Sequence, residues 1–318
     1  MNMKGRLPKI TWYLSKIKTR LSKIKRSETW YAYLFLIPTF VGIAIFAFFP
    51  ILSSFWWSLH ELRYRIKWTG MPFIGFSNYI WAFTNPNIWG SLTYTLYFVA
   101  VSVTLEFLIG LGMALAMFHT FRLRGILRAV VIVPWAVPAI IQASMWKWMF
   151  HPDAGVVSDI LMRIGLISKP LNFLGEPILA MHSVILADVW KTSSFMAILL
   201  FAGLASIPQD IYDSAKVDGA RTWFRFRYIT LPLMFPIIMV SLLFRTMDAF
   251  RVFDLVYGLT GGGPGTTTEV LSTFSYKYYF SYARFGQGST LAIVIFLMII
   301  VISALYIRNL QKTLRFRR

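Results

Sequence analysis

The stretch DIYDSAKVDGARTWFRFRYITLPLMFP at residues 210–236 carries three acidic and four basic residues. Strongly apolar sequence lies on both sides of it, in a chain of 318 residues that is 57% hydrophobic and only 14% charged. Soluble globular domains carry roughly 25% charged residues. A charged and aromatic segment in this setting therefore indicates a polar loop between two membrane helices.

Six segments around this loop are long and apolar enough to cross a bilayer, whose hydrocarbon core of about 30 Å needs about 20 helical residues. They lie at 30–57, 91–118, 126–150, 178–204, 233–257 and 288–307. The third contains Pro134 and Pro138 and the fifth contains Pro236, which are tolerated where neighbouring helices satisfy the freed carbonyl groups. We therefore predict an all-α membrane protein with six transmembrane helices.

The basic residues predict the orientation of these helices. With the N-terminus inside, the inner segments hold 21 Lys and Arg residues, the outer loops hold 7, and 4 lie within the spans. Cytoplasmic loops carry the excess of Lys and Arg in membrane proteins. We expect a multi-pass protein of the cytoplasmic (inner) membrane with both termini in the cytoplasm and the loop at 205–232 on the same side.

The chain then divides into four parts. These are a basic cytoplasmic tail at 1–29, the first span with its outer loop at 30–90, a five-helix core at 91–308, and a second basic tail at 309–318. The first tail alternates bases with apolar residues, so we expect an orientation signal that also anchors on anionic lipid. The net charge of +19 belongs to this pattern rather than to one soluble basic face, and we expect no nucleic acid partner.

The residue types give little support for catalysis. The chain has no cysteine, and its four histidines are scattered without the spacing of metal ligands. The carboxylates and histidines form no set of nucleophile, base and orienting group near one membrane face. We expect a non-catalytic protein with no metal site and no cofactor.

The polar loop itself predicts a helical hairpin. Two short helices at 210–231 turn at Gly219, which allows a tight turn. In the second helix Ala220, Trp223, Phe224 and Tyr228 share one face with Leu231, while Phe226 lies off it. Such a face can lie on lipid or fill a groove in a partner protein.

The order of residues in the loop favours a partner protein. The segment DSAKVDGARTWFRFRYITLPLMFP resembles the signature loop of permeases of binding-protein-dependent importers, in which Glu-Ala-Ala is followed after two residues by Asp-Gly-Ala and later by Phe, Ile and Pro. Aspartate stands here for the usual glutamate and serine for the first alanine, so the negative charge is kept. The matching positions are Asp213, Ser214, Ala215, Asp218, Gly219, Ala220, Phe226, Ile229, Pro232 and Pro236.

A second segment, LTGGGPGTTTEVLSTFSYKYYF at 259–280, resembles the Gly-Gly-Pro segment of permeases in the carbohydrate-uptake branch, of the maltose, trehalose and glycerol-phosphate type. Its glycines are not followed by Lys and Ser or Thr at the spacing of a phosphate-binding loop. The resemblance extends from about residue 30 to the end of the chain. It implies the type-1 fold of ABC importer permeases, with a cytoplasmic coupling-helix hairpin between spans four and five.

The resemblance also implies partners. These are a second permease subunit that forms a heterodimer, two cytoplasmic ATP-binding subunits in which ATP is hydrolysed, an extracytoplasmic solute-binding protein and a sugar, besides the membrane lipid. The residues implied to contact the ATP-binding subunit are Asp213, Ser214, Ala215, Asp218, Gly219, Ala220, Trp223 and Phe226.

Ionisable residues within the predicted spans form the second candidate site, because charges at membrane depth are costly and face a protein interior or a water-filled path. They could pair internally and hold helices together, or they could bind solute. Resemblance to the maltose type implies solute contacts at Asp188, Lys191, Thr192, Arg245 and Ala249, to which spacing adds Asp248 and Arg251. The eight ionisable residues are Glu106, Lys147, Asp188, Lys191, Arg245, Asp248, Arg251 and Asp254.

We therefore expect a membrane subunit of an ATP-driven importer that moves a disaccharide or oligosaccharide by alternating access. A sugar phosphate such as glycerol phosphate is one alternative, because Arg245 and Arg251 suit a phosphate group. An ion-coupled secondary transporter is another, although such a carrier is expected to show related halves and no convincing internal repeat is present.

Overall fold

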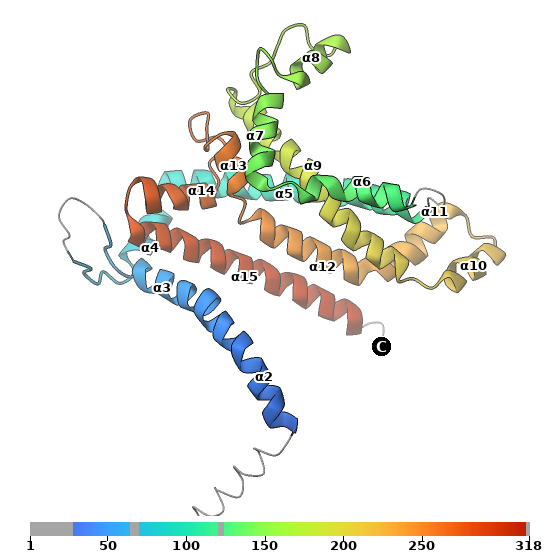
Figure 1. Ribbon diagram of the computed structural model, residues 1–318, viewed down its shortest axis with the longest axis horizontal. Helices are drawn as coiled ribbons and strands as arrows, with labels where there is room; N and C mark the ends of the chain where they lie inside the picture. Colours follow the sequence, from blue (N-terminus) through green and yellow to red (C-terminus); the bar gives the residue numbers. More distant parts are fainter. Residues whose placement is uncertain (1–27, 64–69, 120–123, 316–318) are drawn as a thin grey trace, which may run out of the picture. The chain divides into compact units, whose positions relative to one another are not determined.

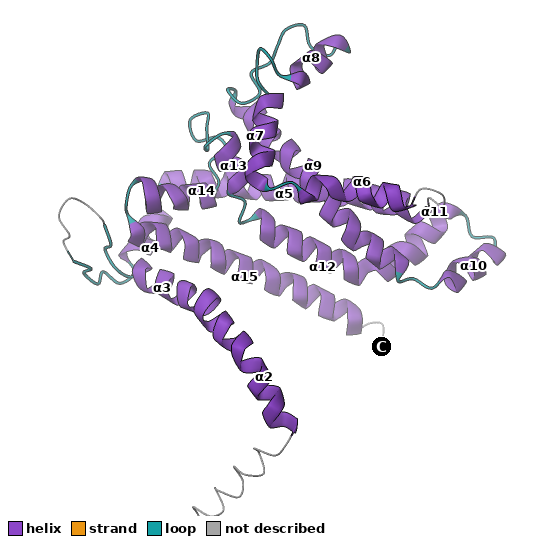
Figure 2. Ribbon diagram, in the orientation of Figure 1, coloured by secondary structure: helices purple, strands orange, loops and turns teal. Residues whose placement is uncertain are grey.

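The computed structural model describes residues 28–63, 70–119 and 124–315. The regular structure of this part is helical, with two isolated bridge pairings and no strand (Figure 2). The predicted tail at 1–29 lies almost wholly outside the described residues, as does the end of the tail at 309–318. The all-α prediction is confirmed for the described part of the chain.

The described residues divide into two units, with the boundary between Trp56 and Trp57. In the first, α2 (Glu28–Ile43) continues through a π-helical turn (Ala44–Phe48) into α3 (Phe49–Ser58). The resulting span, Trp30–Ser58, has a mean hydropathy of 2.4 in its most apolar window and no buried residue there. A helix that is hydrophobic on every side and exposed suits a bilayer, where lipid covers its surface.

The second unit is built around four long helices, α5 (Pro86–His119), α9 (Pro177–Ala205), α12 (Leu231–Ala249) and α15 (Phe285–Arg315). Helix α5 packs along α9, α12 packs against both, and α15 lies along α12 (Figure 1). Small residues permit this packing: a Cβ atom at Gly110 would lie 2.8 Å from Met196, and one at Gly203 would lie 2.8 Å from Ile237.

Three groups of buried apolar residues fill the second unit. One joins α5 and α9 to α7 (Ala139–Met149) and α13 (Asp254–Leu259), around Phe98 and Trp146. Another joins α5, α9 and α12 to α10 (Gln209–Val217), around Met196 and Tyr212. The third joins α4 (Ser77–Thr84) and α5 to α14 (Leu271–Tyr276) and α15. Together they hold both ends of the bundle in place.

The third predicted span is not one straight helix. The chain forms α6 (Arg124–Ala136) and α7, which meet at 92°. Residue Pro138 lacks a backbone N–H and has extended backbone angles (φ −57°, ψ 141°) immediately before α7, so the helical hydrogen bonding stops there. Five helices of the described part are therefore long and apolar enough to span a membrane, and the bent pair is a sixth candidate.

The fifth predicted span, 233–257, is also shifted. Helix α12 ends at Ala249, and after a short break the chain forms α13. Arg251 lies in the break and Asp254 begins α13, so the prediction that both lie within the span is wrong. Beyond α7, the short helix α8 (Val156–Arg163) precedes α9.

The predicted helical hairpin is half correct. Helix α10 is a separate short helix, as expected. The second helix, α11 (Thr222–Arg225), does not end before the membrane segment, because a π-helical turn (Phe226–Thr230) joins it directly to α12. Residues Thr222–Ala249 thus form one helix of 28 residues. Both prolines lie inside this continuous helix: Pro232 is in the first turn of α12, directly after the π-helical turn, and Pro236 is further inside α12.

Candidate functional site

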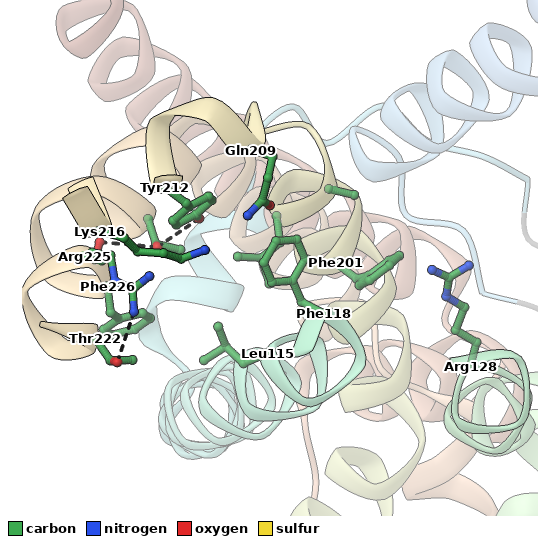
Figure 3. Close-up of a pocket in the computed structure, with 13 residues that line it drawn as sticks. Leu115, Phe118, Arg128, Phe201, Gln209, Tyr212, Lys216, Thr222, Arg225 and Phe226 are labelled. Carbon is green, nitrogen blue, oxygen red and sulfur yellow. Dashed lines mark hydrogen bonds between the residues drawn. The ribbon is translucent and has the colours of Figure 1, made fainter. Parts of the chain in front are cut away.

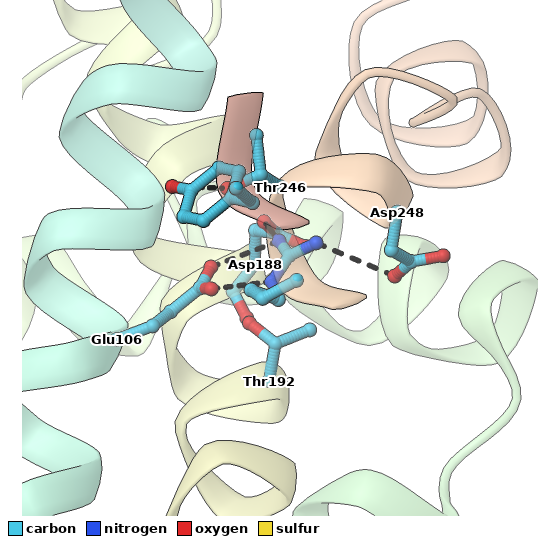
Figure 4. A network of polar contacts seen from close by, with 7 residues as sticks. Glu106, Asp188, Thr192, Thr246 and Asp248 are labelled. Atoms are coloured by element: carbon cyan, nitrogen blue, oxygen red, sulfur yellow. Dashed lines mark hydrogen bonds and ion pairs between the residues drawn. The ribbon is translucent and has the colours of Figure 1, made fainter. Parts of the chain in front are cut away.

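Arg245 on α12 forms the centre of a buried ion cluster that joins three of the long helices (Figure 4). Its guanidinium donates two hydrogen bonds to the carboxylate of Glu106 on α5, through Nε to Oε2 and through Nη2 to Oε1, the second at 2.9 Å. Nη2 also donates to Oδ2 of Asp188 on α9. The planar guanidinium binds the Glu106 carboxylate through two parallel hydrogen bonds and the Asp188 carboxylate through a third. Because the three residues are on different helices, the cluster fixes α5, α9 and α12 against one another.

The charges of this cluster are buried and pair with one another inside the protein. The Arg245 side chain is 2% exposed and that of Glu106 is not exposed at all. Burial of a guanidinium is costly, and the carboxylates of Glu106 and Asp188 offset the loss of its hydration. Sequence reasoning named Glu106 but did not join it to the others, because its partner is 139 residues away. The pair could have been expected from the rule that an acidic residue within an apolar span has a partner of opposite charge.

The remaining charges near the cluster are more exposed. Asp248 accepts a hydrogen bond from Nη1 of Arg245 at 3.3 Å and lies 3.6 Å from Nη2 of Arg251. Both pairs have the spacing of three that the sequence suggested. Asp188 and Lys191 have the same spacing, but Asp188 pairs with Arg245, and Lys191 has no ion pair within the described residues.

A polar cavity of about 270 Å³ opens beside the cluster. It lies where α12 ends, next to α9 and to the bend between α6 and α7. Six of the seven residues predicted to contact solute line it, and Ala249, which is buried, does not. Glu106 is not part of the wall either. The lining residues are Trp135, Ala139, Gln142, Asp188, Lys191, Thr192, Arg245, Asp248, Arg251, Val252, Phe253, Asp254 and Leu255.

The bend at Pro138 determines one wall of this cavity. Trp135, in the last turn of α6, stacks on Phe195 of α9 with ring centroids 5.9 Å apart. Gln142, in the first turn of α7, is buried and donates from its side-chain amide to the carbonyl of Ala187. Each of the two helices is thereby fixed to α9, one on either side of the bend.

The second candidate site is the polar segment at 209–230. Gly219 has φ +77°, and a Cβ atom added to it would meet no neighbouring atom within 4 Å, so it is the left-handed backbone and not crowding that favours glycine. Tyr212 anchors α10 to the start of α12, because its hydroxyl lies 3.1 Å from Thr230 Oγ1. The segment is therefore a helix and a turn that pack on the bundle through one face.

The opposite face of the segment is exposed. Asp213, Ser214, Asp218 and Gly219 are exposed, whereas Ala215, Ala220 and Phe226 are half-buried. Lys216 Nζ donates to Asp213 Oδ1 at 2.7 Å, and this hydrogen bond is the main cause that lowers the pKa of the Asp213 carboxyl below its ordinary value. Trp223 is 72% exposed. The sequence correctly grouped the aromatic residues, and they face outward rather than into the bundle.

The glycine segment at 259–270 is folded on itself. Thr268 Oγ1 lies 2.7 Å from Thr260 Oγ1 and 2.7 Å from the carbonyl oxygen of Gly263. The buried Glu269 forms an ion pair with Lys277. These contacts bring the two ends of the segment together. Within the described residues no group of three metal-ligating side chains occurs.

Residues 106–315 match the family model described as "Binding-protein-dependent transport system inner membrane component". The chain belongs to this family. The permease is 41% identical to the trehalose/maltose transport system permease protein MalF of Thermococcus litoralis, over 93% of this chain and 98% of that protein. It is 36% identical to the sulfoquinovosyl glycerol transport system permease protein SmoG of Agrobacterium fabrum, over 88% of this chain and 90% of that protein.

The fold of the permease also matches a solved structure. A crystal structure of a bacterial ABC transporter involved in the import of the acidic polysaccharide alginate aligns with a TM-score of 0.78 and 26% identity, over 92% of this chain and 99% of that chain. The resemblance to permeases of binding-protein-dependent ABC importers, and with it the type-1 permease fold, is confirmed. The roles assigned to individual residues in the two candidate sites stay predictions.

Proposed function

We propose that the permease is one of two membrane subunits of an ATP-driven importer for a neutral disaccharide or oligosaccharide. Its own chain is a transport component and has no catalytic role, because ATP is bound and hydrolysed by two separate cytoplasmic subunits. An extracytoplasmic binding protein delivers the sugar. The observation that carries this proposal is the polar cavity at the end of α12, in a chain that covers 98% of a trehalose/maltose permease.

The charge balance of the cavity supports a neutral sugar. Its lining holds three carboxylates, Asp188, Asp248 and Asp254, and three cations, Lys191, Arg245 and Arg251. Arg245 is already occupied by Glu106 and Asp188. A site with balanced, alternating charges offers donors and acceptors for hydroxyl groups but no excess of positive charge for a phosphate. The sugar-phosphate alternative is therefore the weaker one.

The volume of the cavity supports a solute that enters it one end at a time. Ligand pockets commonly have volumes of about 300–1000 Å³, and about 270 Å³ is slightly below that range. Trp135 and Phe253 add aromatic walls to the polar groups, a combination that suits the apolar faces and hydroxyl edges of a sugar. The cavity suits one end of an oligosaccharide while the rest lies outside it.

The exposed face of the 209–230 segment supports coupling to an ATP-binding subunit. Val217 is 88% exposed and Trp223 72% exposed, beside Phe224 and Tyr228. Exposed aromatic side chains around a short helix are typical of a surface that enters a groove in a partner. In the proposed cycle, closure of the ATP-binding subunits moves this segment and switches the permease between outward-open and inward-open states.

The exposed apolar window of the first span supports a second membrane subunit. No residue in the most apolar window of Trp30–Ser58 is buried, which leaves the surface of that window for lipid or for a partner helix. We propose that both ends of the chain lie in the cytoplasm, because basic residues favour that side three to one.

Variants of the cavity test the substrate. We expect Lys191→Gln and Asp248→Asn to raise the KM for uptake of trehalose or maltose about tenfold or more, because a hydrogen bond to a charged group contributes about 1.5–3 kcal/mol. Uptake is measured in proteoliposomes that contain the ATPase and the binding protein. Lys147→Gln is the matched control, since Lys147 is exposed and does not line the cavity.

Three outcomes of this experiment contradict the proposal. Unchanged KM values in both cavity variants remove these residues from the solute path. Uptake of glycerol phosphate in preference to neutral sugars supports the sugar-phosphate alternative. Uptake that is driven by an ion gradient without any ATPase supports a secondary carrier.

A glycine pair tests the coupling role. Gly219 and Gly165 have φ +77° and +75°, and a side chain at either would meet no atom within 4 Å. Valine costs about 1–2 kcal/mol of backbone strain at each position, but only Gly219 lies in the proposed coupling segment. We expect Gly219→Val to insert normally and to uncouple ATP hydrolysis from uptake, while Gly165→Val keeps both. Equal uptake in the two variants contradicts the coupling role.

A further inference from the structure

A cavity of about 780 Å³ lies next to α10 (Figure 3). It is formed between the ends of α5 and α9 and the segment of α11 with its π-helical turn (Phe226–Thr230), with α6 on one side and α10 on the other. It is separate from the polar cavity described above and shares no lining residue with it. Its wall consists of Leu115, Phe118, Arg128, Phe201, Leu204, Ala205, Gln209, Tyr212, Lys216, Thr222, Arg225, Phe226 and Thr230.

The charged residues in this wall are all cations. Arg128, Lys216 and Arg225 line the cavity, and no acidic side chain does. Asp213, which binds Lys216 and has its pKa lowered mainly by that bond, is exposed and outside the lining. A cavity with three cations and no acid in its wall has a positive potential that attracts an anion.

Two of these cations have unused binding capacity. The Arg128 guanidinium lies 4.6 Å from the centre of the Phe201 ring, and Arg225 Nη2 donates to Thr222 Oγ1 at 3.2 Å. Arg225 Nε is buried and has no hydrogen-bond partner within the described residues. A buried donor of a charged group that is left unpaired costs free energy, and a bound anionic oxygen would remove that cost.

The space between the cations is apolar. Figure 3 shows Leu115, Phe118 and Phe201 between Arg128 on one side and Lys216 with Arg225 on the other. A small soluble anion would pair with the cations but would leave the apolar floor, formed by these three side chains, exposed to water. A molecule with an anionic head and hydrocarbon chains matches both parts of the wall at once, and basic pockets between membrane helices on the cytoplasmic side bind anionic lipid head groups in this way.

We propose that this cavity binds the head group of an anionic phospholipid from the inner leaflet. Its phosphate pairs with Arg225 and Lys216, and the start of its acyl chains lies on the apolar floor towards Arg128. The bound lipid connects α10 and α11 to α5 and α6, and so stiffens the segment that the proposed function assigns to coupling. The assignment to the inner leaflet rests on the topology that the proposed function assumes, whereas the site itself does not.

Native mass spectrometry tests the site without any transport measurement. The permease is released from nanodiscs that contain equal amounts of phosphatidylglycerol and phosphatidylcholine. We expect the wild type to retain phosphatidylglycerol in preference, and Arg225→Gln and Arg128→Gln each to retain about fivefold less, since each base near an anionic lipid contributes about a factor of five. Arg227→Gln is the matched control, because Arg227 is exposed and outside the cavity wall.

The outcomes separate the occupants. Loss of phosphatidylglycerol on addition of millimolar inorganic phosphate or glycerol phosphate assigns the cavity to a soluble anion and overturns the lipid. Equal loss in Arg227→Gln, or no preference over phosphatidylcholine in the wild type, overturns the site. Retention of lipid that vanishes when the ATPase is bound assigns the cavity to the partner protein.

The topology is checked in the same cysteine-free chain. A single Val217→Cys variant has its only thiol at a position that is 88% exposed, and a membrane-impermeant maleimide is applied to right-side-out vesicles. Protection from the reagent places α10 inside and the lipid in the inner leaflet. Labelling from outside overturns the proposed topology and moves the lipid to the outer leaflet, while the mass spectrometry still decides whether the cavity binds it.

Discussion

Replacement of Arg245 by methionine is the most informative change to the helix bundle. It leaves the volume of the side chain nearly unchanged but removes the only cation that contacts Glu106 and Asp188 in the described part. Two carboxylates then face each other in a region where Glu106 has no exposed surface. Loss of one partner of a buried ion pair costs about 3–5 kcal/mol. The ratio of folded to unfolded protein should fall by about two to three and a half orders of magnitude.

The assay is equilibrium unfolding by sodium dodecyl sulfate in bicelles, followed by the fluorescence of the 12 tryptophans. Asp248→Asn is the comparison, because Asp248 is 63% exposed and an exposed pair contributes about 0–1 kcal/mol. The triple variant Glu106→Leu, Asp188→Leu, Arg245→Leu should recover most of the lost stability, since apolar packing can replace a buried ion cluster. The reasoning is refuted if Arg245→Met unfolds within about 1 kcal/mol of the wild type.

Two further changes test the packing of helices and the glycine segment. Gly110→Val should destabilise the permease by about 1–3 kcal/mol, because a Cβ atom there would lie 2.8 Å from Met196. Gly112→Val should be neutral, because a Cβ atom there would have no neighbouring atom within 4 Å. Unfolding in bicelles compares the two variants, and equal stabilities contradict the close contact. Glu269→Gln removes the buried charge that holds its lysine partner, so limited proteolysis should cut the 259–270 segment several times faster. Exposed Glu176→Gln is the control, and a cleavage rate equal to that of the control shows that the ion pair does not secure the segment.

The sequence predicted most of the fold because its apolar runs are long. The spans at 91–118, 178–204 and 288–307 each lie within a helix of the structure. The break in the third span was harder, since proline is common in membrane helices and only its surroundings decide between a kink and a turn. Pro236 lies inside α12, whereas Pro138 interrupts the chain between α6 and α7.

The candidate sites were predictable to different degrees. The polar segment at 209–230 was visible from local order alone, because its motif is contiguous, but the continuous helix from α11 into α12 was not. Pairs within one helix, such as Arg245 with Asp248, follow from spacing. The contact between Glu106 and Arg245 depends on how α5 packs on α12, which no local pattern in one sequence determines.

The uninterrupted helix Thr222–Ala249 has a mechanical consequence. Trp223, at the exposed end, and Asp248, at the edge of the polar cavity, belong to the same continuous helix and lie about 37 Å apart along its path at about 1.5 Å per residue. No loop separates Trp223 from Asp248, and the π-helical turn with Pro232 and Pro236 marks where this helix can bend. The turn at Gly219 lies just before this helix, so the chain can change direction there without breaking the helix.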